Sequence, residues 1–428
     1  MSKKIAVIGF GAAAIGFLWQ FMDNEDYEID VYEKAGNVMS SSLSGIRSDG
    51  KFIVSEEMGS DIYIPMSIQR EALEIYKNSE YFVYDDVYMG FGNKEDYLMF
   101  YNAGFQPIRS EVIHIGTDQL KNVIPQIFEK IHEAKNIKFH FNEHIKEIKE
   151  GKTIHIFGYA DRLYDYIVVA VGRSGYKLVD DIIKENDGLR HENEKQIVDI
   201  GVRFEMPDIL VEDLNKRNYE WKVKKTNNQT GHGIRTFCYN PQGQVVSEIH
   251  NGFKTVNGHT YNDNSKKSNN TNFAILVSAE FTYPFQNPNQ FGENIALISN
   301  QLAGGNKIML QKLGDFLEYK RTKRIGRVKP TLPENEYTLC NINLAMPSQI
   351  RQSLVGFIEE LGNVVPGIIQ EDNLLYFSEV KFYGNKTQNK DGIYFIGDCS
   401  GNTRSIVHAS SHGIMMAREI LNSSIKNA

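Results

Sequence analysis

A glycine-rich turn stands between an apolar run and an apolar helix at the start of the chain. Residues 4–8 (KIAVI) form a short continuous apolar run, which is typical of a parallel strand buried on both faces. Residues 12–22 (AAAIGFLWQFM) are apolar on nearly every side, as in a helix wedged against a sheet. Residues 28–33 (EIDVYE) are the next expected strand. This order predicts a βαβ unit and therefore an α/β fold.

The turn between this strand and helix fits the G-x-G-x-x-G/A fingerprint of dinucleotide-binding proteins. Gly9 permits the tight turn, Gly11 lets a pyrophosphate approach the backbone, and Ala14 keeps helix and strand close. The amides of Ala12 and Ala13, together with the helix dipole, would bind the phosphates. The alternative is a tight turn in some unrelated α/β protein, but strand, helix and the acidic residue described next are all in register.

That acidic residue is Glu33, which ends the second strand 19 residues after Ala14. This is the place for a carboxylate that accepts hydrogen bonds from the adenosine ribose hydroxyls, and we group the adjacent Lys34 with the predicted cofactor contacts. The same turn serves FAD and NAD, so these residues predict a dinucleotide without deciding which one.

A second segment, residues 392–398 (GIYFIGD), bears on that choice. It resembles the second FAD fingerprint of the two-dinucleotide-binding-domain flavoproteins, in which an apolar strand ends in Gly-Asp. The resemblance implies that Gly397 and Asp398 lie at the flavin ribitol. It also implies a helix, starting near Thr403 and including Ile406, whose N-terminal dipole points at the flavin N1/C2=O edge. Taken alone, the pair could equally be a turn followed by a helix cap.

Further segments extend the resemblance over most of the chain. Residues 166–175 (YIVVAVGRSG) resemble the strand and glycine segment that passes the cofactor in these flavoproteins, which assigns Gly172 and Arg173 to the cofactor site. The chain as a whole resembles a bacterial family of uncharacterised FAD-dependent dehydrogenases, and this adds Ser48 and Lys51. The segments that carry this family resemblance are 48–51, 114–118, 172–175, 199–203, 235–238, 256–259, 271–274, 379–383 and 397–413.

The resemblance implies a fold and the cofactor FAD, but no substrate. The chain also departs from the family at residues 397–401 (GDCSG), at His408, where the family commonly has Gln, and in a short stretch between Glu33 and Ser48. Because these departures fall near the expected cofactor, the chemistry of the family does not transfer automatically.

The expected architecture is a discontinuous, Rossmann-like FAD-binding domain with an inserted β-rich substrate domain. Residues 1–195 and 374–428 would form the first, and residues 196–373 the second, with the substrate at the domain junction. From residue 199 onward apolar and polar residues alternate, as in antiparallel strands. Residues 251–272 are rich in Asn, Gly, Lys and Ser, which predicts either a solvated loop or a loop that contacts substrate.

Five residues are candidates for catalysis. His408 is a candidate proton donor, although helix packing is the default for such a residue. Its partner four residues on, His412, makes a metal pair conceivable, but no third ligand is evident and no metal is expected. Cys399 is either a reactive thiol or, preferably, a small buried hydrophobe. His259, Lys381 and Tyr383 lie in family-like motifs, as does Arg235, and each of the four could bind an anionic or carbonyl substrate group or make an ordinary surface ion pair.

Composition restricts the partners. The net charge of −7 gives no general attraction to nucleic acid, three widely separated cysteines suggest a reducing cytoplasm, and no apolar run is long enough for a membrane helix.

The function predicted from the sequence is an FAD-dependent oxidoreductase that transfers a hydride between flavin N5 and a small organic substrate. An electron carrier or a nicotinamide would be its redox partner. A nicotinamide-dependent dehydrogenase, a non-catalytic flavin-binding redox sensor and an RNA-modifying flavoprotein remain the alternatives.

Overall fold

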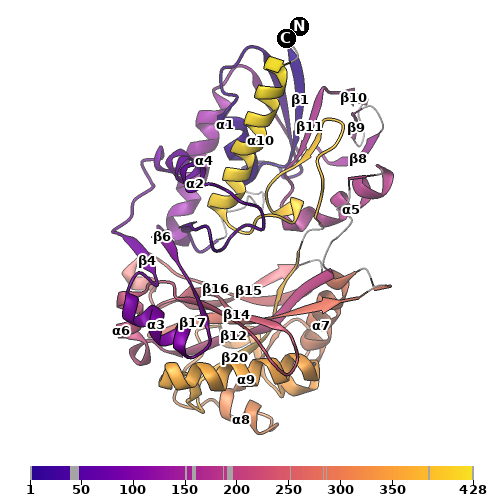
Figure 1. Ribbon diagram of the computed structural model, residues 1–428. Coiled ribbons are helices and arrows are strands. Elements are labelled where there is room, and N and C mark those ends of the chain that lie inside the picture. Colours follow the sequence, from indigo (N-terminus) through magenta and orange to yellow (C-terminus); the bar gives the residue numbers. More distant parts are fainter. Residues whose placement is uncertain are drawn as a thin grey trace. The chain divides into compact units, whose positions relative to one another are not determined.

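The computed structural model divides the chain into two compact units. It describes residues 2–38, 48–149, 152–156, 161–186, 188–189, 196–250, 252–282, 284–285, 287–383 and 386–426. Unit 1 consists of residues 1–86, 113–194 and 383–428, and unit 2 of residues 87–112 and 195–382. Both units mix helices and strands, so the chain is a mixed α/β protein, as expected (Figure 1).

Unit 1 alternates strands and helices over most of its length. Its elements are β1 (Lys3–Ile8), α1 (Ala12–Trp19), β2 (Tyr27–Glu33), β3 (Lys51–Val54), α2 (Met66–Lys77), α4 (Gly116–His132), β7 (Ile137–Phe141), β8 (Ile145–Lys149), β9 (Thr153–Ile156), β10 (Arg162–Leu163), β11 (Tyr166–Val169), α5 (Tyr176–Glu185), β21 (Ile393–Phe395) and α10 (Ile406–Lys426). Strand β6 (Ser110–His114) leads into this unit from unit 2.

The central sheet of unit 1 has five strands in the order β21-β11-β1-β2-β7. All four neighbouring pairs are parallel. The expected βαβ unit is therefore present, and strand β21 from the far end of the sequence completes the sheet at its edge. Parallel strands that alternate with helices must bury both faces of the sheet, which explains the continuous apolar runs at residues 4–8 and 166–169.

Different elements cover the two faces of this sheet. Ile5 and Val7 of β1 pack into a core with α1, α2, α4 and α10. Ala6 and Ile8, which point the other way, pack with residues of α5, β8 and β9. In Figure 1, the yellow helix α10 lies beside the indigo helix α1, although they come from opposite ends of the chain.

Helices α1 and α10 approach so closely that their backbones touch. A Cβ atom on Gly16 would lie 2.0 Å from the carbonyl oxygen of Ser410, and one on Gly413 would lie 2.1 Å from that of Ala13. The Ser410 hydroxyl donates a hydrogen bond to the Ala12 carbonyl at 2.8 Å. Small residues on both helices therefore serve this contact, which joins the first and last segments of unit 1.

Unit 2 is built on one large sheet. Its elements are β4 (Val87–Gly90), α3 (Lys94–Asn102), β5 (Gln106–Ile108), β12 (Gln196–Pro207), α6 (Glu212–Arg217), β13 (Lys222–Thr226), β14 (Gly233–Asn240), β15 (Gln244–His250), β16 (Phe253–His259), β17 (Asn270–Phe281), α7 (Pro288–Leu302), β18 (Ile308–Lys312), α8 (Leu313–Leu317), β19 (Tyr337–Leu339), α9 (Ser348–Val364) and β20 (Leu374–Lys381).

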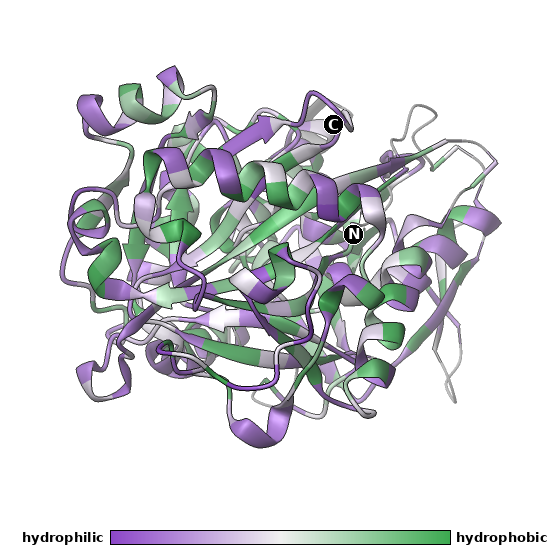
Figure 2. Ribbon diagram, turned by 90° about the horizontal axis from the view of Figure 1, so that it is seen from below, coloured by the Kyte–Doolittle hydropathy of each residue, from purple (hydrophilic) through white to green (hydrophobic). Residues whose placement is uncertain are grey.

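The eight strands of that sheet run in the order β19-β18-β20-β12-β17-β14-β13-β5. All neighbours are antiparallel except β18 and β19. One face carries the apolar residues of β12, such as Val202 and Phe204, and packs against apolar residues of α9. Its other face carries Arg203 and Glu205, and the β15–β16 hairpin packs over part of it. In Figure 2, the helices carry both hydrophilic (purple) and hydrophobic (green) residues.

The prediction of a loop at residues 251–272, made from composition, is wrong where strand β16 lies. Strand β16 lies inside this stretch and pairs with β15 from Gln244↔His259 to His250↔Phe253. Phe253 and Val256 are buried in two different hydrophobic clusters, and the two residues between them are polar, so no alternation of apolar and polar residues marks the strand. Gly252, with φ of +94°, occupies the turn before β16.

The boundaries of the two units differ from the expected domain limits of 195/196 and 373/374. Residues 87–112 group with unit 2 because β5 pairs with β13. Strand β20 also groups with unit 2, since it pairs with β12 and β18. Among the described residues, no helix has the length and apolar character needed to span a membrane.

Candidate functional site

Four strands of unit 1 end at the same edge of its sheet. Because β1, β2, β11 and β21 are parallel, their carboxyl ends meet there. The residues that follow or close them include Gly9, Glu33, Gly172 and Gly397, all of which the sequence assigned to the cofactor site. Ligands of open α/β sheets bind at this edge, so the topology brings the predicted residues together where a ligand would be expected.

The first glycine turn has the geometry that its sequence predicts. Gly9 has φ of +90°, and a Cβ atom there would lie 2.8 Å from the carbonyl oxygen of Ala170. Gly11 is the N-cap of α1 and no side chain caps the helix. Ala12, Ala13 and Ala14 follow and are buried. Gly11 has no side chain with which to cap the first turn of α1, and a phosphate group can take that role.

The second of these alanines also contacts the C-terminal fingerprint. A Cβ atom on Gly397, whose φ is +72°, would lie 2.6 Å from the Cβ atom of Ala13. Both the small side chain at position 13 and the glycine at position 397 are thus needed for α1 to reach the end of β21. The sequence had assigned the close packing to Ala14, which is fully buried in the core.

Glu33 is held in place by backbone amides. The Phe10 amide donates to Glu33 Oε2 at 3.1 Å, and the Ala35 amide donates to Oε1 at 3.0 Å. Each carboxylate oxygen can accept a further hydrogen bond, so the group remains able to bind sugar hydroxyls. The adjacent Lys34 side chain is exposed.

Asp398 lies at the end of β21 among polar partners. The Thr403 hydroxyl donates to Asp398 Oδ1 at 3.0 Å, and Arg173 Nε lies 3.3 Å from Oδ2. Burial raises the pKa of Asp398, while the charge of Arg173 and the hydrogen bond from Thr403 oppose that rise. Gly172, with φ of +62°, turns the chain so that Arg173 reaches this carboxylate. The structure thus joins the residues after β11 to those after β21.

Helix α10 begins later than predicted, at Ile406 rather than near Thr403. Ser405 precedes it, and its hydroxyl accepts a hydrogen bond from the His408 amide at 3.2 Å. Thr403 instead belongs to a turn that forms a bridge with Ser60. The helix start is therefore capped by a side chain, in contrast to the start of α1.

A loop that the sequence did not assign to the site, residues 55–61, is bound to this turn. The Arg404 amide donates to the Gly59 carbonyl at 2.9 Å, and the Asp61 amide donates to the Asn402 carbonyl at 2.8 Å. The Arg404 guanidinium binds both oxygens of Asp61, at 2.7 and 2.6 Å. Although burial alone would raise the pKa of Asp61, Arg404 and the nearby Lys386 lower it. No sequence motif pointed to this loop.

His408 has partners at both ring nitrogens. Nε2 donates to the Ser55 carbonyl at 2.9 Å, and Nδ1 lies 2.6 Å from the Ser405 hydroxyl. The carbonyl can only accept, so Nε2 of this ring carries a proton. The ring is buried, and a Cβ atom on Gly59 would lie 2.4 Å from its Nδ1. These contacts favour the packing interpretation of His408 over the proton-donor interpretation.

His412 supports the C-terminal fingerprint. Its Nδ1 accepts a hydrogen bond from the Gly397 amide at 3.2 Å, and burial lowers its pKa to about 4. Within the described ranges, no three His, Cys, Asp or Glu side chains are grouped to hold a metal ion. The histidine pair therefore positions backbone on two sides of the site, with His408 against residues 55–59 and His412 beneath Gly397.

Cys399 is a buried thiol. Its Sγ lies 3.2 Å from the Val169 carbonyl and 3.1 Å from the Ile396 carbonyl. Burial raises its pKa to about 12. A thiol with this pKa is not ionised near neutral pH, so the preferred interpretation, a small buried hydrophobe, fits the geometry and the reactive-thiol interpretation does not.

The remaining predicted residues divide between the two units. In unit 1, the Ser48 carbonyl accepts a hydrogen bond from Thr117 at 2.8 Å, Lys51 is buried with its Nζ 3.1 Å from Asp49, and Tyr383 lies under Arg404. In unit 2, His259 ends β16 and Lys381 ends β20. Ile406, at the start of α10, packs against the core of unit 1.

The residues at the sheet edge fit a dinucleotide. An uncapped helix start would take the pyrophosphate, the carboxylate of Glu33 would take the ribose, and the partly buried carboxylate of Asp398 would take the ribitol. Lys51 and Ser48 are already engaged in local contacts, so they add less to this fit than the glycine turns do.

A match to a protein family supports FAD as the cofactor. Residues 187–381 match the protein family described as "FAD-dependent protein, C-terminal domain-like". FAD, the cofactor predicted from the sequence, is thus also the one named by the family that matches much of unit 2. No curated protein matches the sequence.

Solved structures with a distant overall likeness include the following three. They are the tetrameric form of 2-methyl-3-hydroxypyridine-5-carboxylic acid oxygenase (10% identity, 98% of this chain, 82% of that chain, TM-score 0.40), tetracycline destructase Tet(51) (12%, 99%, 83%, 0.37) and CtdE in complex with FAD (10%, 97%, 83%, 0.37). At these TM-scores the likeness carries no argument about the present chain.

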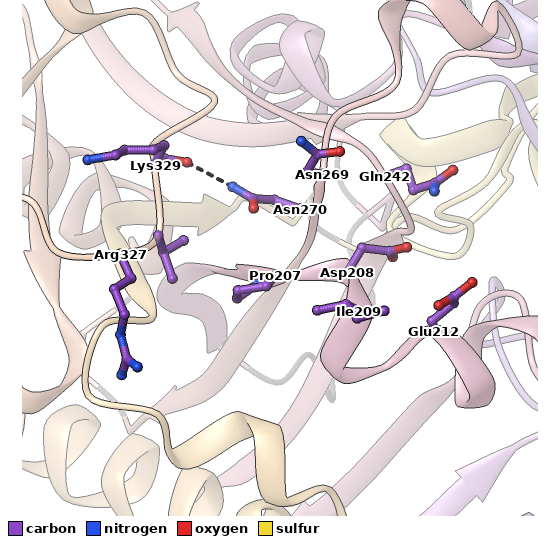
Figure 3. Close-up of a pocket in the computed structure, with 10 residues that line it drawn as sticks. Pro207, Asp208, Ile209, Glu212, Gln242, Asn269, Asn270, Arg327 and Lys329 are labelled. Atoms are coloured by element: carbon purple, nitrogen blue, oxygen red, sulfur yellow. Dashed lines mark hydrogen bonds between the residues drawn. The ribbon is translucent and has the colours of Figure 1, made fainter.

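Unit 2 contains a cavity of about 530 Å³ away from the predicted residues (Figure 3). Acidic Asp208 and Glu212 lie on one side of the cavity, and basic Arg327 and Lys329 on the other. The Asn270 side-chain amide, which also lines the cavity, donates to the Lys329 carbonyl at 2.8 Å. None of the residues predicted to act in catalysis or cofactor binding lines this cavity.

Proposed function

We propose that the protein is an FAD-dependent oxidoreductase that transfers a hydride between the flavin and a small organic substrate. The observation that carries this proposal is the meeting of two fingerprints at one sheet edge. Gly397 rests on Ala13, so the turn that would bind the pyrophosphate and the carboxylate that would bind the ribitol belong to one structural unit. The family match over residues 187–381 supports the same cofactor.

The residues of unit 1 have separate tasks in this proposal. The amides after Gly11 bind the pyrophosphate, and Glu33 binds the adenosine ribose. Asp398 binds the ribitol, while Thr403 and Arg173 hold its carboxylate in position. His412 and His408 fix the backbone around the site and supply no proton.

The bound FAD would supply the hydride-accepting or hydride-donating ring, and the protein would supply orientation and the surrounding charges. The substrate is a small molecule, and an electron carrier or a nicotinamide regenerates the cofactor. The placement of the substrate at the junction of the two domains stays a prediction from the sequence.

The test is the spectrum and cofactor content of the purified protein. We expect a yellow protein, or a colourless one that binds one equivalent of added FAD. Gly11→Val should abolish FAD retention, because a branched side chain would occupy the space of the phosphates, and unit 2 should stay folded. Gly233→Ala is the control, since its Cβ would meet only Ser278, at 4.0 Å. A protein that binds NAD but no FAD would contradict the proposal.

Turnover separates an enzyme from a redox sensor. The FAD-loaded protein should oxidise or reduce a small substrate through many cycles when an electron partner is supplied. Binding of FAD without turnover with any panel of alcohols, amines, carboxylates and nicotinamides would favour a sensor instead.

A further inference from the structure

Three cationic side chains surround one phenylalanine ring on the polar face of the unit 2 sheet. Phe237 belongs to β14, and the Lys381 Nζ, Lys222 Nζ and Arg235 Cζ atoms lie 5.1, 5.6 and 5.6 Å from its ring centre. Arg235 comes from the same strand as Phe237, Lys222 from the neighbouring β13, and Lys381 from β20, which β12 and β17 separate from β14. Like charges gather in this way only where anions compensate them.

Two of these cations have a close carboxylate. Arg235 pairs with the fully buried Asp199, which also accepts a hydrogen bond from Ser278 at 2.7 Å. The Lys222 Nζ atom lies 2.5 Å from Glu220, and both side chains are buried. Each of these two cations thus has a carboxylate partner close by.

Lys381, in contrast, shares its nearest carboxylate with another cation. Its nearest carboxylate oxygen, Glu379 Oε1, is 3.8 Å away. Arg203 already binds Glu379 with two hydrogen bonds, from Nη2 to Oε1 at 2.7 Å and from Nε to Oε2 at 2.8 Å. Within the ranges that the structure describes, no acceptor lies within the 3.5 Å hydrogen-bond limit of the Lys381 ammonium.

The Lys381 side chain is only 12% exposed. An ammonium withdrawn from water without an acceptor is unfavourable, because it loses hydration and gains no hydrogen bond. An anion beside Lys381 would supply the missing acceptor and satisfy the ammonium.

We infer that Lys381 and Arg235 form a binding site for a small organic carboxylate beside Phe237. The carboxylate receives a charge-assisted hydrogen bond from Lys381, and the Arg235 guanidinium, held by Asp199 and Ser278, lies across the same ring. The partly exposed Phe237 ring contacts the apolar part of the ligand. Under the proposed function this site gives the substrate class, an organic acid, but its existence does not require the flavin.

The test is calorimetric titration of the full chain with benzoate, in a buffer low in chloride and sulfate. Benzamide is the matched probe, because it has nearly the same shape and no charge. We expect benzoate to bind and benzamide to bind at least tenfold more weakly, since loss of a charge-assisted hydrogen bond has about this effect. Absence of benzoate binding, or equal binding of both probes, would overturn the inference.

Variants of Lys381 test whether benzoate binds at this side chain. Lys381→Met keeps the aliphatic chain and should weaken benzoate binding at least tenfold, whereas Lys381→Arg should retain most of it. Lys225→Met is the control, because Lys225 also lies over a phenylalanine ring, Phe105 at 5.0 Å, but has Glu360 2.6 Å away. Unchanged binding in Lys381→Met, or an equal loss in the control, would contradict the assignment.

The FAD content of each sample is measured from its absorbance at the same time. Loss of benzoate binding in Lys381→Met with full FAD content supports the carboxylate site alone. Wild-type protein that binds benzoate but no FAD would leave the site in place and refute the proposed function instead.

Discussion

The carbonyl oxygen of Ala13 lies 2.1 Å from the place where a Cβ atom on Gly413 would have to be. Neither helix α1 nor helix α10 can therefore accept a larger residue here without moving. Gly413→Ala should cost about 1–3 kcal/mol or more in the free energy of unfolding, because a backbone atom cannot give way as a side chain can. Urea denaturation measures this, and FAD retention should fall with it. Gly233→Ala, where a Cβ has space, should stay within about 0.5 kcal/mol of wild type.

Replacing Asp398 should weaken FAD binding but should leave the protein folded. Asp398→Asn should weaken FAD binding about tenfold to a hundredfold, because it removes the charged acceptor assigned to the ribitol. Quenching of flavin fluorescence during titration measures the affinity. The control is Asp391→Asn in the preceding turn, an exposed residue whose φ of +52° suits asparagine. Equal affinities for both variants would remove Asp398 from the cofactor site.

His412 should make the protein sensitive to acid. Its pKa falls from 6.5 to about 4 on folding, so protonation favours the unfolded chain. Its contribution to stability is complete above pH 6.5 and is lost as the pH falls toward 4, by about 3 kcal/mol. In His412→Asn, the amide oxygen can accept the Gly397 hydrogen bond but does not titrate. The difference in unfolding free energy between the two proteins should therefore change over this pH range, and parallel pH profiles would contradict the prediction.

Replacing only one member of the buried Arg203–Glu379 pair should lower the free energy of unfolding. Arg203→Met should destabilise unit 2 by about 3–5 kcal/mol, because it leaves the Glu379 carboxylate buried without its main partner. The double variant Arg203→Met, Glu379→Leu should recover much of this loss in urea denaturation. Lys216→Met, which breaks an exposed pair with Glu212, should cost less than about 1 kcal/mol. A double variant as unstable as the single one would argue against the charge explanation.

Cys399 should resist alkylation in the folded protein. Its pKa of about 12 leaves almost no thiolate at pH 8, and its side chain is buried. Iodoacetamide followed by peptide mass spectrometry should modify the partly exposed Cys238 first and Cys399 only after denaturation. Rapid modification of Cys399 in native protein would restore the reactive-thiol interpretation.

The parallel core of unit 1 was predictable because its signals are local. A buried strand, a glycine turn and an apolar helix are neighbours in the sequence, so residues 4–33 could be interpreted without knowing what packs on them. The end of β21 was predictable by resemblance to a known fingerprint. Both segments reach the same edge because parallel strands align their ends, a consequence of topology rather than of either segment alone.

The roles of individual side chains depended on distant contacts and were less accessible. For His408 the sequence left a proton donor as a candidate beside the default of helix packing, and it could not show that Nε2 binds the carbonyl of Ser55, which is 353 residues away in sequence. The loop 55–61 has no motif, since its place is set by hydrogen bonds to residues 402–404. Strand β16 was hidden because its composition is that of a loop and only its pairing with β15 identifies it.

Unit 1 is built from segments that lie far apart in the sequence, which affects how it can fold during synthesis on the ribosome. Helix α1 is made almost first, but α10, which covers it, and β21, which closes the sheet edge, are made last. Until α10 (Ile406–Lys426) has been made, the apolar face of α1 lacks its final cover, and the whole of unit 2 is made in the interval between. Nascent chains should therefore acquire unit 2 before unit 1, and a premature stop before α10 should yield a product that chaperones and proteases recognise.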